Sequence, residues 1–183
     1  NSLFNALHLL GGISFLSIAL PIGLSFHTFQ AMSYTIEIYR GNQKAEKHFG
    51  IYALYVMFYP QLVAGPIERP QNILHQFHEE RHLNVDNLKE GLKMIIWGLF
   101  KKVVIADRLA ITVNNVYRDP VHFQGLPLVI AVIFFSFQLY CDFSGYSDIA
   151  VGTARVMGYD LMANFNRPFI SKSISELWRR WHI

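Results

Sequence analysis

Residues 120–141 read PVHFQGLPLVIAVIFFSFQLYC, a run of 22 residues without Asp, Glu, Lys or Arg. Because a membrane-spanning helix needs about 20 predominantly apolar residues, this run predicts a span. The first 36 residues also lack all four charged types. There Gly11 predicts a break, followed by a kinked span from Ile13 to Ile38. Two such runs in one chain indicate an all-α, polytopic integral membrane protein.

The composition also departs from that of a soluble domain. Of the 183 residues, 52% are hydrophobic and only 16% are charged, against about 25% charged in ordinary globular domains. The net charge of +3 is small, and neither a base-binding motif nor a long Lys/Arg tract accompanies it. We therefore expect membrane lipid, and no nucleic acid, among the partners.

The single cysteine and the chain ends bear on domain organisation. Cys141 lies in an apolar run, which predicts a buried thiol with no disulfide and no zinc-site spacing. The chain opens with Asn1, and Ile183 directly follows a motif that reads as mid-helix. We therefore expect residues 1–183 to be part of a single transmembrane domain, an internal fragment truncated at both ends.

A third long uncharged run extends from His48 to Ile67, and its second half belongs to the proline-rich phrase YPQLVAGPIERP. Proline removes backbone donors and breaks helices, and irregular backbone at membrane depth needs protein or a water-filled cavity around it. The run therefore predicts a helix followed by a re-entrant or cavity-lining turn. Gly65-Pro66 allows backbone amides to approach a ligand, although a simple interfacial turn fits equally well.

Residues 71–91 are the most polar part of the chain and predict an interfacial loop or a surface helix. Spacings of three and four separate His75, His78 and His82, so a helix would align them for a metal. Their charged neighbours favour a solvated face instead, and we predict no metal site.

From Leu92 onward, apolar residues recur at the i, i+3, i+4, i+7 spacing that predicts one apolar helix face. The face comprises Leu92, Ile95, Ile96, Leu99, Val103 and Ala106. Lys101 and Lys102 interrupt this helix. They either snorkel to the membrane interface or meet a phosphate of a nucleotide-like donor.

The phrase DFSGYSD, residues 142–148, places ionisable groups in an otherwise apolar helix, where they are costly and usually paired or functional. Ser144 and Asp148 are four residues apart, and Asp148 and Arg155 share a face. An ion pair within or between helices explains the pattern, and a catalytic carboxylate is the alternative. Small residues nearby predict close helix packing. These are Gly145, Ala150, Gly152 and Ala154.

The C-terminal motif carries the strongest candidate for chemistry. Ser173 and Glu176 form a capping box, which predicts a helix beginning at Ser173. On this helix Trp178 and His182 are four residues apart and would share one face.

Imidazole is the usual general base near neutral pH, and aromatic walls would keep His182 neutral. Arg179 and Arg180 would project elsewhere, towards lipid headgroups, water or an anionic ligand. The alternative is a histidine at the membrane interface beside an aromatic belt. No P-loop, GxSxG or GxGxxG motif is present, so ATP hydrolysis, serine-hydrolase chemistry and dinucleotide binding lack support.

Six phrases together resemble one family. They are ALPIGLSFHTFQAMSY, YPQLVAGPIERP, GLFKKVVIADRL, YCDFSGYSDIAVG, NFNRPF and SELWRRWHI. In this order, over Leu20 to Ile183, they resemble the alginate O-acetylase branch of the membrane-bound O-acyltransferases.

This resemblance implies a many-helix fold around a tunnel, with no bound cofactor. An acyl group passes there from a thioester donor (acetyl-CoA or an acyl carrier) to a hydroxyl acceptor. His182 matches one of two key polar positions of the family. The other is a histidine expected beyond residue 183, which would be the principal base, with His182 orienting or assisting it. The remaining candidates would support the tunnel wall. These are Asp142, Ser144, Asp148, Trp178, Arg179 and Arg180.

The resemblance further implies a multi-pass protein of the bacterial cytoplasmic (inner) membrane, with periplasmic or extracellular acyl-transfer partner proteins and a polysaccharide acceptor. Similar sequences acylate peptidoglycan or cellulose, or transfer D-alanine to teichoic acids, and nothing in these residues reads the sugar. We expect the 183 residues alone to be inactive. A transporter is the alternative of another class, because intramembrane Asp, Arg and His also fit solute movement.

Overall fold

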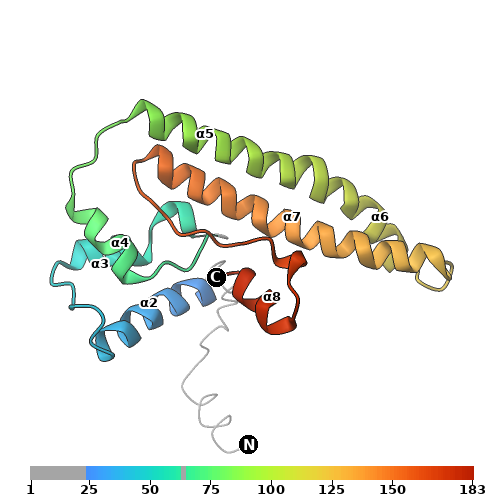
Figure 1. Cartoon of the computed structure of the whole chain (residues 1–183), viewed down its shortest axis with the longest axis horizontal. Coiled ribbons are helices and arrows are strands. Elements are labelled where there is room, and N and C mark those ends of the chain that lie inside the picture. Colours follow the sequence, from blue (N-terminus) through green and yellow to red (C-terminus); the bar gives the residue numbers. More distant parts are fainter. Residues whose placement is uncertain (1–23, 63–64) are drawn as a thin grey trace, which may run out of the picture.

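A computed structural model of the chain describes residues 24–62 and 65–183, and this part is almost entirely helical (Figure 1). The α-helices are α2 (Leu24–Tyr39), α3 (Phe49–Val56), α4 (Pro70–Ile73), α5 (Val85–Leu99), α6 (Asp107–Arg118), α7 (Leu126–Val156) and α8 (Ile174–Arg180). Short 3-10 turns are η1 (Tyr59–Gln61), η2 (Leu74–His78) and η4 (Pro168–Ile170), and η3 (Phe100–Ala106) is a π-helix. The predicted break at Gly11 and the start of the kinked span lie outside the described residues.

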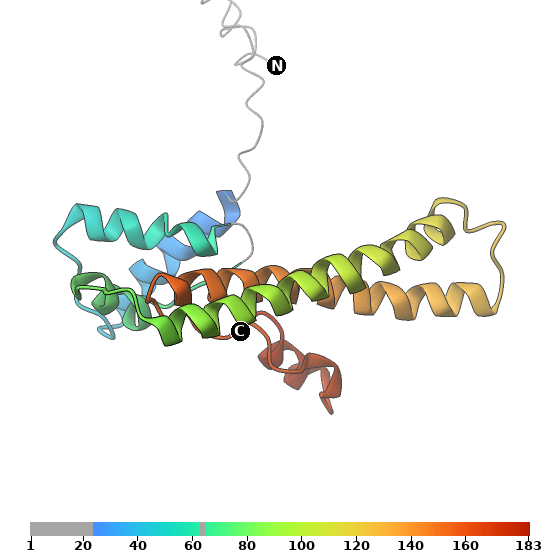
Figure 2. The same ribbon diagram turned by 90° about the horizontal axis from the view of Figure 1, so that it is seen from above.

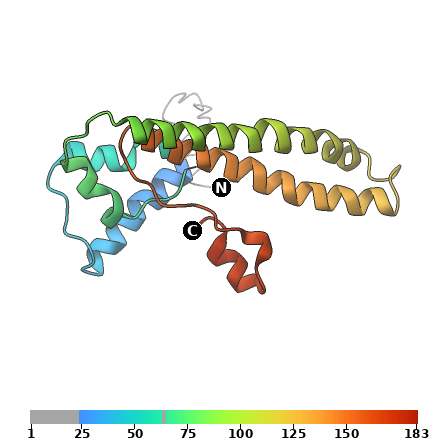
Figure 3. The same cartoon turned by 45° about the horizontal axis from the view of Figure 1, so that its top comes forward.

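The dominant feature is a long antiparallel hairpin. One arm is α5, η3 and α6, which follow one another without a gap, and the other is α7 (Figures 1 and 3). Among the described residues, α7 is the one helix long and apolar enough to cross a membrane, and only 11% of its most apolar window is buried within the chain. A core helix of a soluble protein would be mostly buried, so α7 fits a membrane span. The predicted helix is confirmed and is long and apolar enough to cross a membrane, although it begins at Leu126 and continues through DFSGYSD to Val156.

Paired glycines hold the two arms of the hairpin together. A Cβ added at Gly98 would lie 2.5 Å from the carbonyl oxygen of Gly145, and one at Gly91 would lie 2.6 Å from that of Gly152. Real Cβ atoms essentially never come this close, so only glycine lets the backbones approach in this way. The predicted packing role of the small residues in α7 is confirmed, since all four are buried. These are Gly145, Ala150, Gly152 and Ala154.

The apolar face predicted from Leu92 onward exists, but most of it points away from α7. Ile96 is 66% exposed, and Leu92, Leu99 and Val103 are also exposed. The glycine face of this arm packs against α7, and the apolar face is exposed on the surface of the hairpin. This arrangement is expected where lipid rather than water surrounds the helices. The helix is also longer than predicted, because it begins at Val85.

Helices α2, α3 and α4 gather at one end of the hairpin (Figures 1 and 2). Their core includes Tyr55, Phe58, Ile73 and Leu74, and it joins the hairpin through Ala154 of α7. Helix α3 ends at Val56 and is followed by η1 and irregular backbone. This confirms that the uncharged run from His48 to Ile67 forms a broken helix rather than a straight span.

The capping box at the start of α8 is confirmed, but the helix is shorter than predicted. The Ser173 hydroxyl accepts a hydrogen bond from the Glu176 amide at 3.1 Å, and the Glu176 carboxylate accepts one from the Lys172 amide at 2.9 Å. Helix α8 ends at Arg180. The reading of the C-terminal motif as mid-helix was therefore wrong, because the chain is extended at Trp181.

Candidate functional site

His182 lies on an extended end segment that pairs with the loop after α7. Trp181 and Phe165 form an isolated antiparallel bridge, and the Ile183 amide donates to the Asn164 carbonyl at 3.0 Å. These contacts replace the helical hydrogen bonds that would have continued α8. His182 itself adopts a left-handed conformation with φ 49°, which costs free energy for a non-glycine residue and is held by its surroundings.

The predicted shared helix face of Trp178 and His182 was wrong. Trp178 remains on α8 and is 65% exposed. The His182 ring instead packs edge-to-face on Phe143 of α7, with ring centroids 5.0 Å apart and planes at 77°. Sequence reasoning missed Phe143, whose only signal was its position inside DFSGYSD.

An aromatic cluster surrounds this contact. Its members are Tyr140, Phe143, Phe165, Phe169 and Trp181. Burial among such side chains lowers the pKa of the His182 imidazole below its usual 6.5, because loss of water disfavours the charged form. The neutral imidazole can accept a proton at neutral pH, as the sequence interpretation required.

His182 lines a cavity of about 420 Å³ between the end segment and α2. Its apolar wall includes Phe29, Met32 and Ile36 of α2, and its polar rim includes Arg40 and Glu37. The guanidinium of Arg40 lies 3.8 Å from the Glu37 carboxylate. A mostly apolar cavity with a few convergent polar groups is the usual form of a small-molecule site.

Glu68, in the proline-rich phrase, ties this cavity to the loop after α7. It is fully buried, and its carboxylate accepts hydrogen bonds from the Met162 amide and from the Asn72 side chain, the latter at 2.7 Å. Burial raises the pKa of Glu68, and these two bonds oppose that shift. Its neighbours Ile67 and Arg69 line the cavity, so Glu68 fixes part of the wall without entering it.

The acidic residues of DFSGYSD form ion pairs between the hairpin arms. Lys101 in η3 is buried, and its ammonium lies 2.6 Å from Asp148 and 3.0 Å from the Ser144 hydroxyl. Lys102 lies 2.6 Å from Asp142. Both lysines form ion pairs within the hairpin, which corrects the sequence interpretation in which they extend to the membrane interface.

Asp148 and Arg155, which the sequence places on one helix face, do not pair with each other. Arg155 instead pairs with Asp160 at 3.0 Å, because α7 ends at Val156 and the chain folds back. The expected ion pair of Asp148 is confirmed in its interhelical form, with Lys101 as the partner.

The two arginines before His182 make local contacts. Arg180 lies 2.6 Å from Glu176 one turn earlier, and Arg179 donates to the Ser175 hydroxyl at 3.3 Å. Neither side chain reaches the cavity beside His182.

The polar loop holds no metal cluster. His78 lies 2.8 Å from Glu46, and the His75 ring contacts the Gln71 carbonyl at 3.2 Å. In the part of the chain that the structure describes, no group of three or more His, Cys, Asp or Glu is placed to hold a metal ion.

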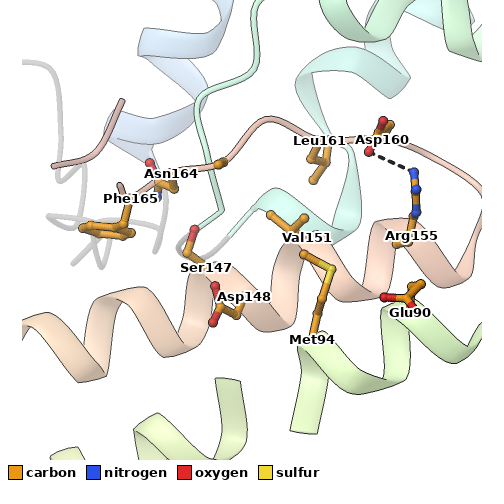
Figure 4. A pocket seen from close by; sticks show the side chains of 11 residues that line it. Glu90, Met94, Ser147, Asp148, Val151, Arg155, Asp160, Leu161, Asn164 and Phe165 are labelled. Atoms are coloured by element: carbon orange, nitrogen blue, oxygen red, sulfur yellow. Dashed lines mark ion pairs between the residues drawn. The ribbon is translucent and has the colours of Figure 1, made fainter. Parts of the chain in front are cut away.

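A second cavity, of about 270 Å³, lies between α7, α5 and the loop after α7 (Figure 4). Ser147 and Asp148 come from α7, Glu90 and Met94 from α5, and Asn164 from the loop. It therefore contains Asp148 but not His182. The other five candidate residues predicted from sequence line neither of the two cavities.

Comparisons with known proteins identify the family of this chain. A family model described as MBOAT, membrane-bound O-acyltransferase family, matches residues 47–183. The chain is 42% identical over 168 residues to a probable alginate O-acetylase, AlgI, of Pseudomonas aeruginosa, covering 91% of this chain and 32% of that protein. It is 35% identical over 194 residues to a peptidoglycan O-acetyltransferase of Helicobacter pylori, covering 92% and 37%.

A more distant relative is a teichoic acid D-alanyltransferase of Streptococcus thermophilus, 30% identical over 168 residues, covering 88% of this chain and 40% of that protein. The chain thus spans about a third of the length of these relatives. The family match includes α3 to α8, both arms of the hairpin and the segment that bears His182. The chain belongs to the membrane-bound O-acyltransferase family.

Proposed function

We propose that this protein is a membrane-embedded O-acyltransferase that moves an acyl group, most simply acetyl, from a thioester donor to hydroxyls of an exported polysaccharide such as alginate. The observation that carries the proposal is the half-buried His182 on the wall of a largely apolar cavity. The relatives favour acyl transfer over the transporter alternative, since their names describe acetylases and acyltransferases.

Acyl transfer from a thioester to a hydroxyl requires a proton acceptor in the cavity and the exclusion of water. The acceptor hydroxyl oxygen attacks the thioester carbonyl, its C–O bond forms, and the C–S bond breaks to release a thiol. The hydroxyl proton passes to an imidazole and then to the leaving sulfur. Neutral His182 either takes this proton or orients a second histidine that does, as the family resemblance implies.

The other candidate residues support this site from a distance. Phe143 holds the His182 ring, while the pairs formed by Asp148 with Lys101 and by Asp142 with Lys102 fix α7 against its neighbour. The Ser144 hydroxyl accepts a hydrogen bond from the Lys101 ammonium that also pairs with Asp148. The helix that carries Trp178, Arg179 and Arg180 leads the chain back to the site.

We also propose that the protein is a multi-pass protein of the bacterial inner membrane. Helix α7 supplies one span, and the arm formed by α5, η3 and α6 lies beside it with an exposed apolar face. The uncharged residues before Glu37 would supply a third. Acyl-transfer partner proteins outside the membrane would carry the group onwards to the polymer.

The test is a transfer assay in membranes from cells that produce the protein. Membranes are incubated with labelled acetyl thioester and alginate, and the alkali-labile label on the polymer is counted. Membranes lacking the protein are the control. Transfer to alginate supports the proposal. Transfer seen only when a D-alanyl thioester replaces the acetyl thioester, or only when peptidoglycan or teichoic acid replaces alginate, would assign the acyl group or the acceptor of the other relatives instead.

A further inference from the structure

The cavity between α7, α5 and the loop after α7 contains polar groups that nothing in the described chain satisfies. Ser147 is 2% exposed and Asn164 is 3% exposed. Among the residues that the structure describes, the Ser147 hydroxyl and both polar atoms of the Asn164 amide have no hydrogen-bond partner. Both residues line this cavity (Figure 4). Buried polar groups almost always find partners, so three orphaned atoms at one cavity point to a missing occupant.

The charged groups in the cavity wall already have partners of their own. Asp148 lies 2.6 Å from Lys101, Glu90 lies 2.7 Å from Lys93, and Arg155 lies 3.0 Å from Asp160. No ionised group of the wall is left to bind a charged ligand. The unpaired hydroxyl and amide can each donate and accept, so they match a neutral group that also does both.

The cavity is too large for a single bridging water. A single water needs a cavity volume of roughly 10–15 Å³, whereas this cavity has a volume of about 270 Å³. Apolar side chains supply the rest of its wall, among them Val151, Leu161 and Phe165. This size and mixed lining suit one sugar ring or a short amide-bearing chain.

We propose that this cavity binds an uncharged, hydrogen-bonding ligand group, a hydroxyl or an amide, held by Ser147 and Asn164. The loop that carries Asn164 separates this cavity from the cavity of His182. Leu161 of the loop lines this cavity, and its neighbour Met162 lines the cavity of His182. The Asn164 carbonyl also accepts the Ile183 amide, so occupancy is coupled to the segment that bears His182. Two sources fit this chemistry, acceptor hydroxyls or amides of a thioester donor, and naming them rests on the proposed function.

The test measures binding to the purified chain in detergent, without turnover, so it can fail independently of acyl transfer. The probes are methyl glucoside for hydroxyls and pantetheine for amides. Saturation-transfer NMR reports contact and titration gives affinity. Binding of methyl glucoside or of pantetheine supports the proposal and identifies the source. Binding of neither overturns it.

Variants tie the binding to the two side chains. Ser147→Ala and Asn164→Ala should each weaken binding about tenfold, as expected for one lost hydrogen bond. Ser136→Ala is the matched control on α7, because its hydroxyl bonds within the helix to Val132. Without ligand, Ser147→Ala should leave the melting temperature unchanged or higher, since an orphaned buried hydroxyl is removed. A clear fall in the melting temperature of Ser147→Ala, with ligand binding unchanged, would show that the Ser147 hydroxyl stabilises the fold instead of binding a ligand, and would refute the proposal.

Discussion

The ion pair between Lys101 and Asp148 offers a quantitative test of how the hairpin is held. The ammonium and carboxylate are 2.6 Å apart, and the two side chains are 10% and 31% exposed. Lys101→Met leaves the Asp148 carboxylate without its cation. Breaking a buried pair costs about 3–5 kcal/mol, and the partial exposure of Asp148 places the expected loss at the lower end, about 3 kcal/mol.

A double-mutant cycle separates the pair from its members. For a chain of this size, about 3 kcal/mol corresponds to a fall in melting temperature of roughly 6–12 °C. Asp148→Asn should cost a similar amount, because it strands the buried ammonium. Lys101→Met with Asp148→Asn should recover most of the loss, since neither charge remains to be buried.

The assay is thermal unfolding of the purified protein in detergent, with protein content of the membrane as a second readout. Lys93→Met is the control on the same arm, because its pair with Glu90 is exposed at 71% and 57% and should contribute less than about 1 kcal/mol. Losses that simply add in the double variant would refute the reasoning. A stable, well-inserted but inactive Asp148→Asn variant would move Asp148 into the catalytic machinery.

Three further predictions follow from the packing and from the buried titratable groups. Gly98→Ala should cost about 1–3 kcal/mol through overpacking and lower the melting temperature, whereas Gly50→Ala, facing only the His48 side chain, should not. Glu68 has a raised pKa, so its buried carboxylate should destabilise the fold at neutral pH, and the melting temperature of the wild type relative to Glu68→Gln should rise as pH falls towards 4.5. The lowered pKa of His182 should keep acyl transfer active as pH falls past 6.5. Phe143→Leu should move the acid limb of the rate–pH profile upward, and an unmoved limb would contradict the ring contact's role.

Local and compositional features of this fold were predictable. The uncharged run before Cys141 identifies the α7 span because length and apolarity alone decide whether a helix can cross a bilayer. Ser173 and Glu176 likewise fixed the start of α8, since a capping box is satisfied within four residues. The prolines after Tyr59 ended α3 for an equally local reason.

Features that depend on register between distant segments were not predictable in the same way. The partner of Asp148 is Lys101 because Gly98 packs on Gly145. The matching seven-residue spacings of Gly91 with Gly98 and of Gly145 with Gly152 were a usable signal, but their antiparallel pairing requires the fold.

The end of α8 and the contact of His182 with Phe143 share this origin. The capping box starts the helix, but the bridge between Trp181 and Phe165 stops it. Helical periodicity assumes that the helix continues, so it paired His182 with Trp178. Tertiary contacts with the loop after α7 outweighed that local tendency and moved the imidazole to α7.

The most direct test of the central claim is the rate of O-acyl transfer by His182→Ala, compared with His78→Ala at equal protein content in the membrane. His78 lies in the polar loop and contacts Glu46, so its loss should leave the rate largely intact. Loss of a group that moves or positions the transferred proton should lower the rate by about 10²–10⁴-fold, and His182→Ala is predicted to show this. Normal transfer by well-inserted His182→Ala protein would contradict the assignment of His182 to the site.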